Sequence, residues 1–108
     1  MRQITANMLA AIVDQREWKE KATSTHRGER GILVRLHDNL IAIVAADTVE
    51  LCAQGWATAT TCDRLNTIAC EFAGATVGRR KGRIIVRKDG VATEYDATEW
   101  ITLARKGA

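Results

Sequence analysis

Proline is absent from this chain of 108 residues, so its turns depend on other residues, chiefly glycine, aspartate and asparagine. Slow prolyl isomerisation is thereby excluded as a folding step. Long apolar runs are absent too, because the longest uncharged apolar run, residues 40–46, is far too short for a membrane-spanning helix. Residues 1–5 lack the apolar core of a secretory signal peptide, which predicts a cytoplasmic protein.

Cysteine and histidine are scarce as well. The three cysteines, Cys52, Cys62 and Cys70, have no Cys-x-x-Cys spacing, which argues against both a disulfide framework and a zinc site. A reducing compartment suits such free thiols. His26 and His37 lie eleven residues apart and have no metal-binding spacing either. We therefore expect neither a metal nor another cofactor.

The overall composition of the chain is that of one small globular domain. Hydrophobic residues make up 46% of the chain and charged residues 27%, so residues 1–108 are expected to form a single domain. The net charge of +3 is local: residues 1–54 are balanced, and residues 55–108 carry nine basic and six acidic side chains. Six cations occur between positions 79 and 88 with no acid among them, and we call them the basic ribbon: Arg79, Arg80, Lys81, Arg83, Arg87 and Lys88.

The N-terminal half predicts one helix followed by strands. Thr5 is the candidate N-cap of the helix, and its apolar stripe has helical spacing at Met8, Leu9, Ile12 and Val13. Trp18 is expected as a lid on the core, and residues 22–30 as a loop or an edge strand. Strands over residues 31–37 and 40–44 flank a predicted two-residue turn, Asp38-Asn39. That turn would pair Leu36 with Ile41, Val34 with Ile43 and Ile32 with Ala45, giving one apolar face.

A second helix is predicted after the bend Gly55–Thr61. Residues 48–52 alternate as a strand does, and Thr60 or Thr61 is the candidate N-cap of the helix that follows. Gly74 is a suitable stop for this helix. Its buried face is predicted from helical spacing to hold Cys62, Leu65, Ile68, Ala69 and Phe72.

The last third of the chain predicts more sheet. A strand over residues 75–77 leads to a predicted basic turn, Arg79-Arg80-Lys81-Gly82. A hairpin of residues 83–88 and 91–95 follows, with Asp89-Gly90 as a strong turn signal. Residues 97–104 are expected as a short helix or a final strand. The predicted fold class is α+β with the order α-β-β-β-α-β-β-β, an antiparallel meander of about five to six strands with two helices packed on one face.

No group of residues predicts catalysis. The candidate nucleophile–base pairs combine Cys62 or Cys70 with His26 or His37, and nothing in the sequence brings such a pair together. Cys62 lies on the apolar face of the second helix and is expected to be a small core residue. Glu94 and Asp96, two residues apart on one strand face, are expected to be solvated rather than to form an acid–base pair. We expect that the protein is not an enzyme.

The basic ribbon is the strongest candidate for a binding site. A hairpin with six cations could follow a phosphate backbone, although no aromatic residue lies within it to stack on single-stranded bases. Arginines also suit docking to an acidic protein surface. The alternative without a binding role is a sheet edge whose charges prevent strand-on-strand aggregation.

The bend before the second helix has a structural explanation. Thr58, Thr60 and Thr61 are expected to cap the helix, which we favour over anion binding at its N-terminus. Trp56 is expected to pack against the helix that it precedes. Arg64 and Asn66, one helical turn or less from the bend, are expected to hold its carbonyl groups.

Two segments resemble a protein family. The hairpin Leu36-His37-Asp38-Asn39-Leu40-Ile41-Ala42 and the bend Gly55-Trp56-x-Thr58-x-Thr60-Thr61-x-x-Arg64-Leu65-Asn66 are similar to those of small uncharacterised proteins encoded by tailed bacteriophages. The similarity covers about residues 30–90, and Asp38 stands where the family commonly has glycine. The resemblance implies a phage or prophage accessory protein in the cytoplasm of the bacterial host, and it implies no activity.

The functional prediction joins this resemblance to the ribbon. We expect a non-enzymatic accessory protein that binds a host or defence-system protein or nucleoprotein, for example as an anti-CRISPR or another host-takeover inhibitor. The alternative is direct DNA or RNA binding with weak sequence specificity. In both cases the predicted binding residues are the six ribbon cations, and neither the partner nor the oligomeric state follows from the sequence.

Overall fold

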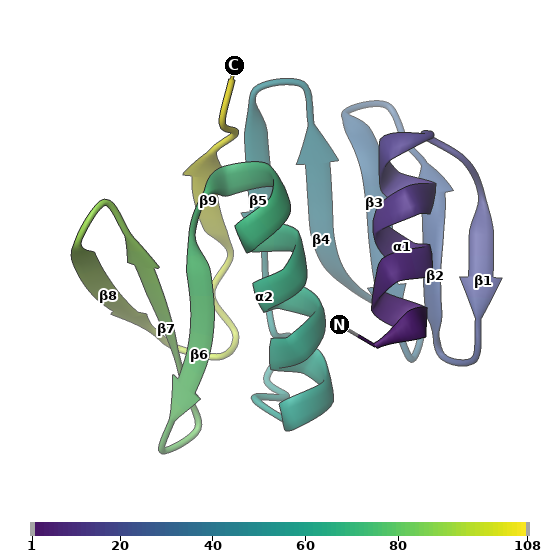
Figure 1. Cartoon of the computed structure of the whole chain (residues 1–108). Coiled ribbons are helices and arrows are strands. Elements are labelled where there is room, and N and C mark those ends of the chain that lie inside the picture. Colours follow the sequence, from purple (N-terminus) through teal and green to yellow (C-terminus); the bar gives the residue numbers. More distant parts are fainter. Residues whose placement is uncertain (1, 108) are drawn as a thin grey trace.

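Both helices lie against one face of a six-stranded antiparallel sheet in the computed structural model, which describes residues 2–107 (Figure 1). The helices are α1 (Gln3–Val13) and α2 (Ala59–Ala73). The strands, in their order across the sheet, are β1 (Trp18–Glu20), β2 (Thr23–Arg27), β3 (Gly31–Leu36), β4 (Asn39–Ala45), β5 (Thr48–Leu51) and β9 (Ile101–Ala104). The predicted α+β class is confirmed. No helix in the described part of the chain is long and apolar enough to cross a membrane.

A second, three-stranded antiparallel sheet holds β6 (Thr76–Arg80), β7 (Arg83–Lys88) and β8 (Val91–Tyr95), in that order. The predicted order places these strands in the same meander as the others. They form their own sheet because β6 follows α2 directly and packs beside it, while β9 occupies the free edge of β5. Figure 1 shows this second sheet standing to one side of α2, away from α1.

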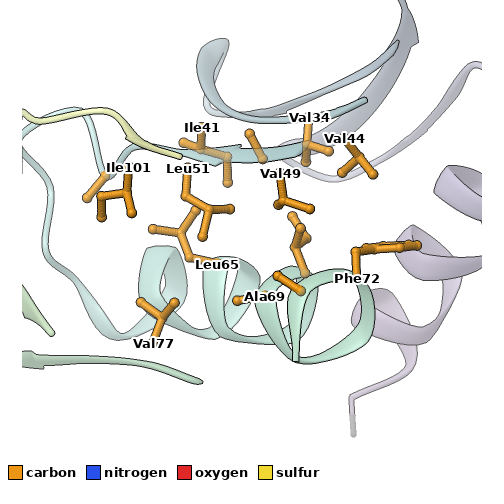
Figure 2. Close-up of a cluster of buried hydrophobic side chains, with 14 of the residues drawn as sticks. Val34, Ile41, Val44, Val49, Leu51, Leu65, Ala69, Phe72, Val77 and Ile101 are labelled. Atoms are coloured by element: carbon orange, nitrogen blue, oxygen red, sulfur yellow. The ribbon is translucent and has the colours of Figure 1, made fainter. Parts of the chain in front are cut away.

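The core lies between α2 and the two sheets. Figure 2 shows sheet side chains such as Val34 and Val49 directed toward Leu65, Ala69 and Phe72 of α2. The same buried cluster includes residues of the second sheet, namely Val77, Ile84 and Val86. The predicted buried face of α2 is confirmed, because all five of its residues are buried. Burial of this face holds the second sheet against the first through α2.

The β3–β4 hairpin differs from the predicted register. The turn is His37-Asp38 rather than Asp38-Asn39, and a β-bulge lies between Val34 and Arg35, shortly before the turn. Val34 therefore pairs with Ala42, and the remaining core pair is Ile32 with Val44. Ile43 consequently lies on the sheet face away from the helices. Both turn residues adopt positive φ (51° and 64°), which His and Asp tolerate better than most residues, so the two-residue turn forms one position earlier than predicted.

The helix caps also differ from the predictions. α1 begins at Gln3 without a side-chain cap, and Thr5 lies inside its first turn with a buried side chain, so Thr5 is not the N-cap. Thr58, rather than Thr60 or Thr61, caps α2, because its Oγ1 accepts a hydrogen bond of 3.2 Å from the backbone N–H of Thr61. Gly74 ends α2 in the left-handed conformation, with a φ of 62°, as predicted.

Candidate functional site

The basic ribbon forms the β6–β7 hairpin, and its cations lie on two faces of the second sheet. The register pairs Arg80 with Arg83 and Thr76 with Arg87. Because side chains alternate along a strand, the ribbon arginines of the outer face are Arg80, Arg83 and Arg87. Arg79 and Lys88 fall on the inner face instead, where the neighbouring strand residues are buried against α2. The structure therefore does not bring the six predicted residues to a single face.

Three of the six cations bind other parts of the chain. Arg79 donates from Nη1 to the backbone oxygen of Ala57 at 3.2 Å, and Lys88 donates from Nζ to the backbone oxygen of Ala104 at 2.9 Å. Arg83 forms ion pairs with Glu94 at 3.3 Å and Asp96 at 3.8 Å. The other three, Arg80, Lys81 and Arg87, are exposed and have no side-chain hydrogen bond or ion pair within residues 2–107. These three residues are the free ribbon cations.

The outer face of the second sheet is mixed rather than uniformly basic. Half-buried Ile85 lies at its centre, between Gly78 of β6 and Glu94 of β8. Glu94, Ile85 and the small side chain of Ala92 thus share the face with three arginines. A face of this kind offers an apolar centre with charged groups around it.

The acid at the margin of this face is held by the turn that follows β8. Asp96 Oδ1 accepts hydrogen bonds from the backbone N–H of Thr98 at 3.0 Å and from its hydroxyl at 2.8 Å. These bonds lower the pKa of Asp96, and the positive charge of Arg83 lowers the pKa further. The carboxyl group of Asp96 is therefore ionised at neutral pH and forms an ion pair with Arg83.

A cleft with a volume of about 490 Å³ lies at a different place, between the β3–β4 turn and the bend before α2. It belongs to the end of the large sheet where both helices begin, the lower end in Figure 1. Its apolar wall consists of Leu36, Ile41 and Ala53, and its polar groups come from His37, Asn39, Gln54 and three threonines of the bend and first helical turn, Thr58, Thr60 and Thr61.

Trp56 lines this cleft and is 64% exposed. The prediction that Trp56 packs against α2 is therefore wrong. The reason is local: the bend turns at Gly55, with a φ of 80°, and Trp56 N–H bonds back to the oxygen of Ala53 at 2.9 Å. This geometry leaves the indole beside an open cleft, in contact with solvent.

A side pocket of about 330 Å³ adjoins the cleft and shares Leu36, His37 and Thr60 with it. Three cations line the side pocket, namely Arg2, Lys21 and Arg64. Because they share these residues, the cleft and the side pocket are neighbours, and the cleft has the apolar wall while the side pocket has the cations.

Arg64 is the buried member of these cations, at 4% exposure. Its Nε donates to Thr23 Oγ1 at 3.2 Å, and its Nη1 pairs with Asp63 at 2.6 Å. Asp63 also pairs with Arg2 at 3.5 Å. The prediction that Arg64 holds the carbonyl groups of the bend is wrong, because its side chain extends from α2 to Thr23 of β2 instead.

A comparison with protein families gives the origin of the chain. A family model described as Kyanoviridae Gp96 protein matches residues 1–104. The chain belongs to this family. The predicted bacteriophage family is thereby confirmed at the level of a phage protein. No curated protein and no solved structure matches the chain.

In this member of the family, the two segments that carried the phage resemblance meet at the cleft. Leu36, His37 and Asn39 come from the hairpin segment, and Trp56 and the threonines come from the bend. Sequence reasoning assigned the bend to folding alone and missed the cleft. The available signal was the joint occurrence of two unusual segments about twenty residues apart, which a small fold brings together.

Two of the three cysteines are buried, and the third is exposed. Cys62 is buried, and burial raises the pKa of its thiol against a smaller lowering by Arg79, so the neutral thiol is favoured. Cys52 is also buried, and exposed Cys70 donates to Asn66 Oδ1 at 3.6 Å. Residues 2–107 contain no cysteine–histidine hydrogen bond and no group of three or more potential metal-ligating side chains.

Proposed function

We propose that this phage protein acts in the host cell without catalysis, by docking the outer face of its second sheet onto an acidic surface of a host or defence-system protein. The observation that carries the proposal is the contrast within the ribbon. Arg79, Arg83 and Lys88 are used inside the chain, while the free ribbon cations are exposed and have no described partner. Cations without an internal role are available for a binding partner.

The chemistry of the outer face favours a protein over a nucleic acid. Protein interfaces combine a desolvated apolar centre with arginines, and Ile85 with the flanking Arg80 and Arg87 has this composition. Arginine also binds carboxylates through two parallel hydrogen bonds. Glu94 on the same face pairs with Arg83 and so reduces the positive charge that a phosphate backbone would meet, whereas a face with both signs of charge suits a protein partner.

The test compares two triple charge reversals in the tagged full chain. The ribbon variant is Arg80→Glu, Lys81→Glu and Arg87→Glu. The control variant, Lys19→Glu, Arg27→Glu and Lys106→Glu, changes the net charge equally at exposed cations of the larger sheet and the C-terminal segment. After affinity capture from phage-infected host lysate, we expect the ribbon variant to lose a captured protein at least about tenfold and the control variant to retain it.

Equal capture by the ribbon variant and the wild-type chain would contradict the proposal and leave edge protection as the role of the ribbon. A gel shift with single- and double-stranded oligonucleotides tests the nucleic-acid alternative. Retardation at low salt that disappears with the ribbon variant would favour direct nucleic-acid binding. Our proposal predicts no retardation.

A further inference from the structure

We propose that the cleft and its side pocket form a binding site for a nucleotide, a small ligand that joins a flat ring to a phosphate. The cleft would take the ring beside Trp56, and the side pocket would take the phosphate. This site is separate from the outer face of the second sheet and does not depend on the function proposed for that face.

The size and lining of the cleft suit a small molecule. Its volume of about 490 Å³ falls within the range of about 300–1,000 Å³ that is typical of ligand sites. Such sites combine apolar walls with a few polar groups that fix the orientation of the ligand. Here Leu36, Ile41 and Ala53 supply the wall.

The exposed indole points to a planar ligand. A tryptophan that is 64% exposed at a concave site offers a large flat surface, and bases stack on such surfaces with little dependence on sequence. Besides the threonines, three polar side chains line the same cleft. Gln54 uses its Nε2 to bind the oxygen of Leu40 at 2.7 Å, which leaves its Oε1 as an acceptor. His37 and Asn39 have no side-chain hydrogen bond within residues 2–107, so they are available to the edge of a ring.

The charge of the adjoining side pocket points to an anion. Arg2, Lys21 and Arg64 line it. Asp63 forms ion pairs with Arg2 and with Arg64 and so neutralises part of their charge. Lys21 has no side-chain hydrogen bond or ion pair within residues 2–107, and it is held at the β1–β2 turn with a φ of 53°. The region therefore keeps a net positive charge, with Lys21 as its free cation.

The start of α2 supports the same end of the ligand. Thr60, in the first turn of α2, lines both the cleft and the side pocket. The N–H of Thr61 is bound to Thr58 Oγ1, whereas Ala59 and Thr60 have no backbone N–H partner in the described chain. Free N–H groups and the helix dipole at this position favour a phosphate oxygen. The threonine cluster is thus both a cap and one wall of the proposed site.

Isothermal titration calorimetry on the full chain tests the site. The probes are the four ribonucleoside 5′-monophosphates, adenosine and inorganic phosphate. We expect at least one nucleotide to bind one-to-one with a Kd below about 1 mM. Adenosine and inorganic phosphate should each bind at least about tenfold more weakly than the best nucleotide, because each retains only one of the two contacts.

Matched variants locate the binding. Trp56→Ala should weaken nucleotide binding at least about tenfold and Trp56→Phe much less, because Phe keeps a stacking ring. Lys21→Gln should weaken it about three- to tenfold. Trp100→Ala and Lys19→Gln serve as controls, because Trp100 is 42% exposed, Lys19 is exposed, and both lie outside the cleft and the side pocket. Both controls should bind like the wild-type chain.

Three results would overturn the proposal. The first is no heat of binding from any of the four nucleotides up to about 1 mM. The second is nucleotide binding that Trp56→Ala and Lys21→Gln leave unchanged. The third is binding that disappears with Arg80→Glu and Arg87→Glu, which would assign the anion to the second sheet. Trp56→Ala should remain folded because the indole is exposed, so its loss of binding reports on the site.

Discussion

The cleft end of the large sheet and the outer face of the second sheet use arginine in opposite ways. The side chain of Arg64, a residue of α2, is buried and bonds to Thr23 and Asp63. Arg87 is exposed and has no side-chain partner in the described chain. An arginine that is satisfied within the fold stabilises that fold, whereas an arginine without a partner adds little stability and is available for binding. Count and spacing of cations in a sequence do not distinguish the two uses.

The largest expected difference between the two regions concerns apolar contacts. Leu65→Ala removes a fully buried side chain between α2 and the sheet and should lower the free energy of unfolding by about 3 kcal/mol. Ile85→Ala, on the half-buried outer face, should cost about 1 kcal/mol. Urea denaturation followed by circular dichroism measures both. Similar losses at the two positions would show that the outer face is packed as tightly as the core.

The two arginines provide the next test. Arg64→Ala should lower the free energy of unfolding by about 2–3 kcal/mol, because Thr23 loses a buried hydrogen bond and Asp63 a close partner. Arg87→Ala should change it by less than about 0.5 kcal/mol. The same urea titrations give the values. A neutral Arg64→Ala variant would mean that solvent replaces its contacts and that Arg64 is not a structural residue.

Thr58 and Thr60 allow the capping of α2 to be tested separately from the lining of the cleft. Thr58→Ala removes the acceptor for the N–H of Thr61 and should cost about 1 kcal/mol of unfolding free energy. Thr60→Ala should change it by less than about 0.5 kcal/mol, because exposed Thr60 makes no capping bond. Thermal denaturation of the two variants measures the difference. The reverse order would return the cap to Thr60, one of the two residues, Thr60 and Thr61, that the sequence offered as the cap.

The smallest expected effect is a pH dependence in the second sheet. The pKa of Asp96 is lowered in the fold, so its stabilising contribution is present above the unfolded pKa and is lost as the pH falls through the folded pKa. Asp96→Asn should therefore reduce the loss of melting temperature between neutral and strongly acidic pH. Asp89→Asn, at the exposed turn after β7, is the control and should leave the pH profile unchanged. Identical profiles for the wild-type chain and Asp96→Asn would contradict this role.

Local sequence signals predicted the elements whose structure depends on near neighbours. The buried face of α2 follows from helical spacing, and Gly74 and Asp89-Gly90 end their elements because their backbones adopt positive φ. The order of helices and strands in residues 31–95 was accessible for the same reason. These signals are independent of how distant segments meet.

The features that sequence missed depend on distant contacts. The β3–β4 register depends on a turn at His37-Asp38, one position earlier than predicted, and on the β-bulge at Val34 and Arg35. The partners of Arg79 and Lys88 are backbone carbonyls 22 and 16 residues away, which no pattern within the ribbon indicates. The cleft likewise exists only because packing brings the hairpin turn beside the bend.

The most direct test of the central claim is the comparison of the two triple charge reversals by quantitative affinity capture from phage-infected host lysate. The claim is that Arg80, Lys81 and Arg87 are the part of the basic ribbon that binds a partner. It predicts at least about a tenfold loss of a captured protein with the ribbon variant and none with the control variant. Equal capture by the two variants would contradict the claim.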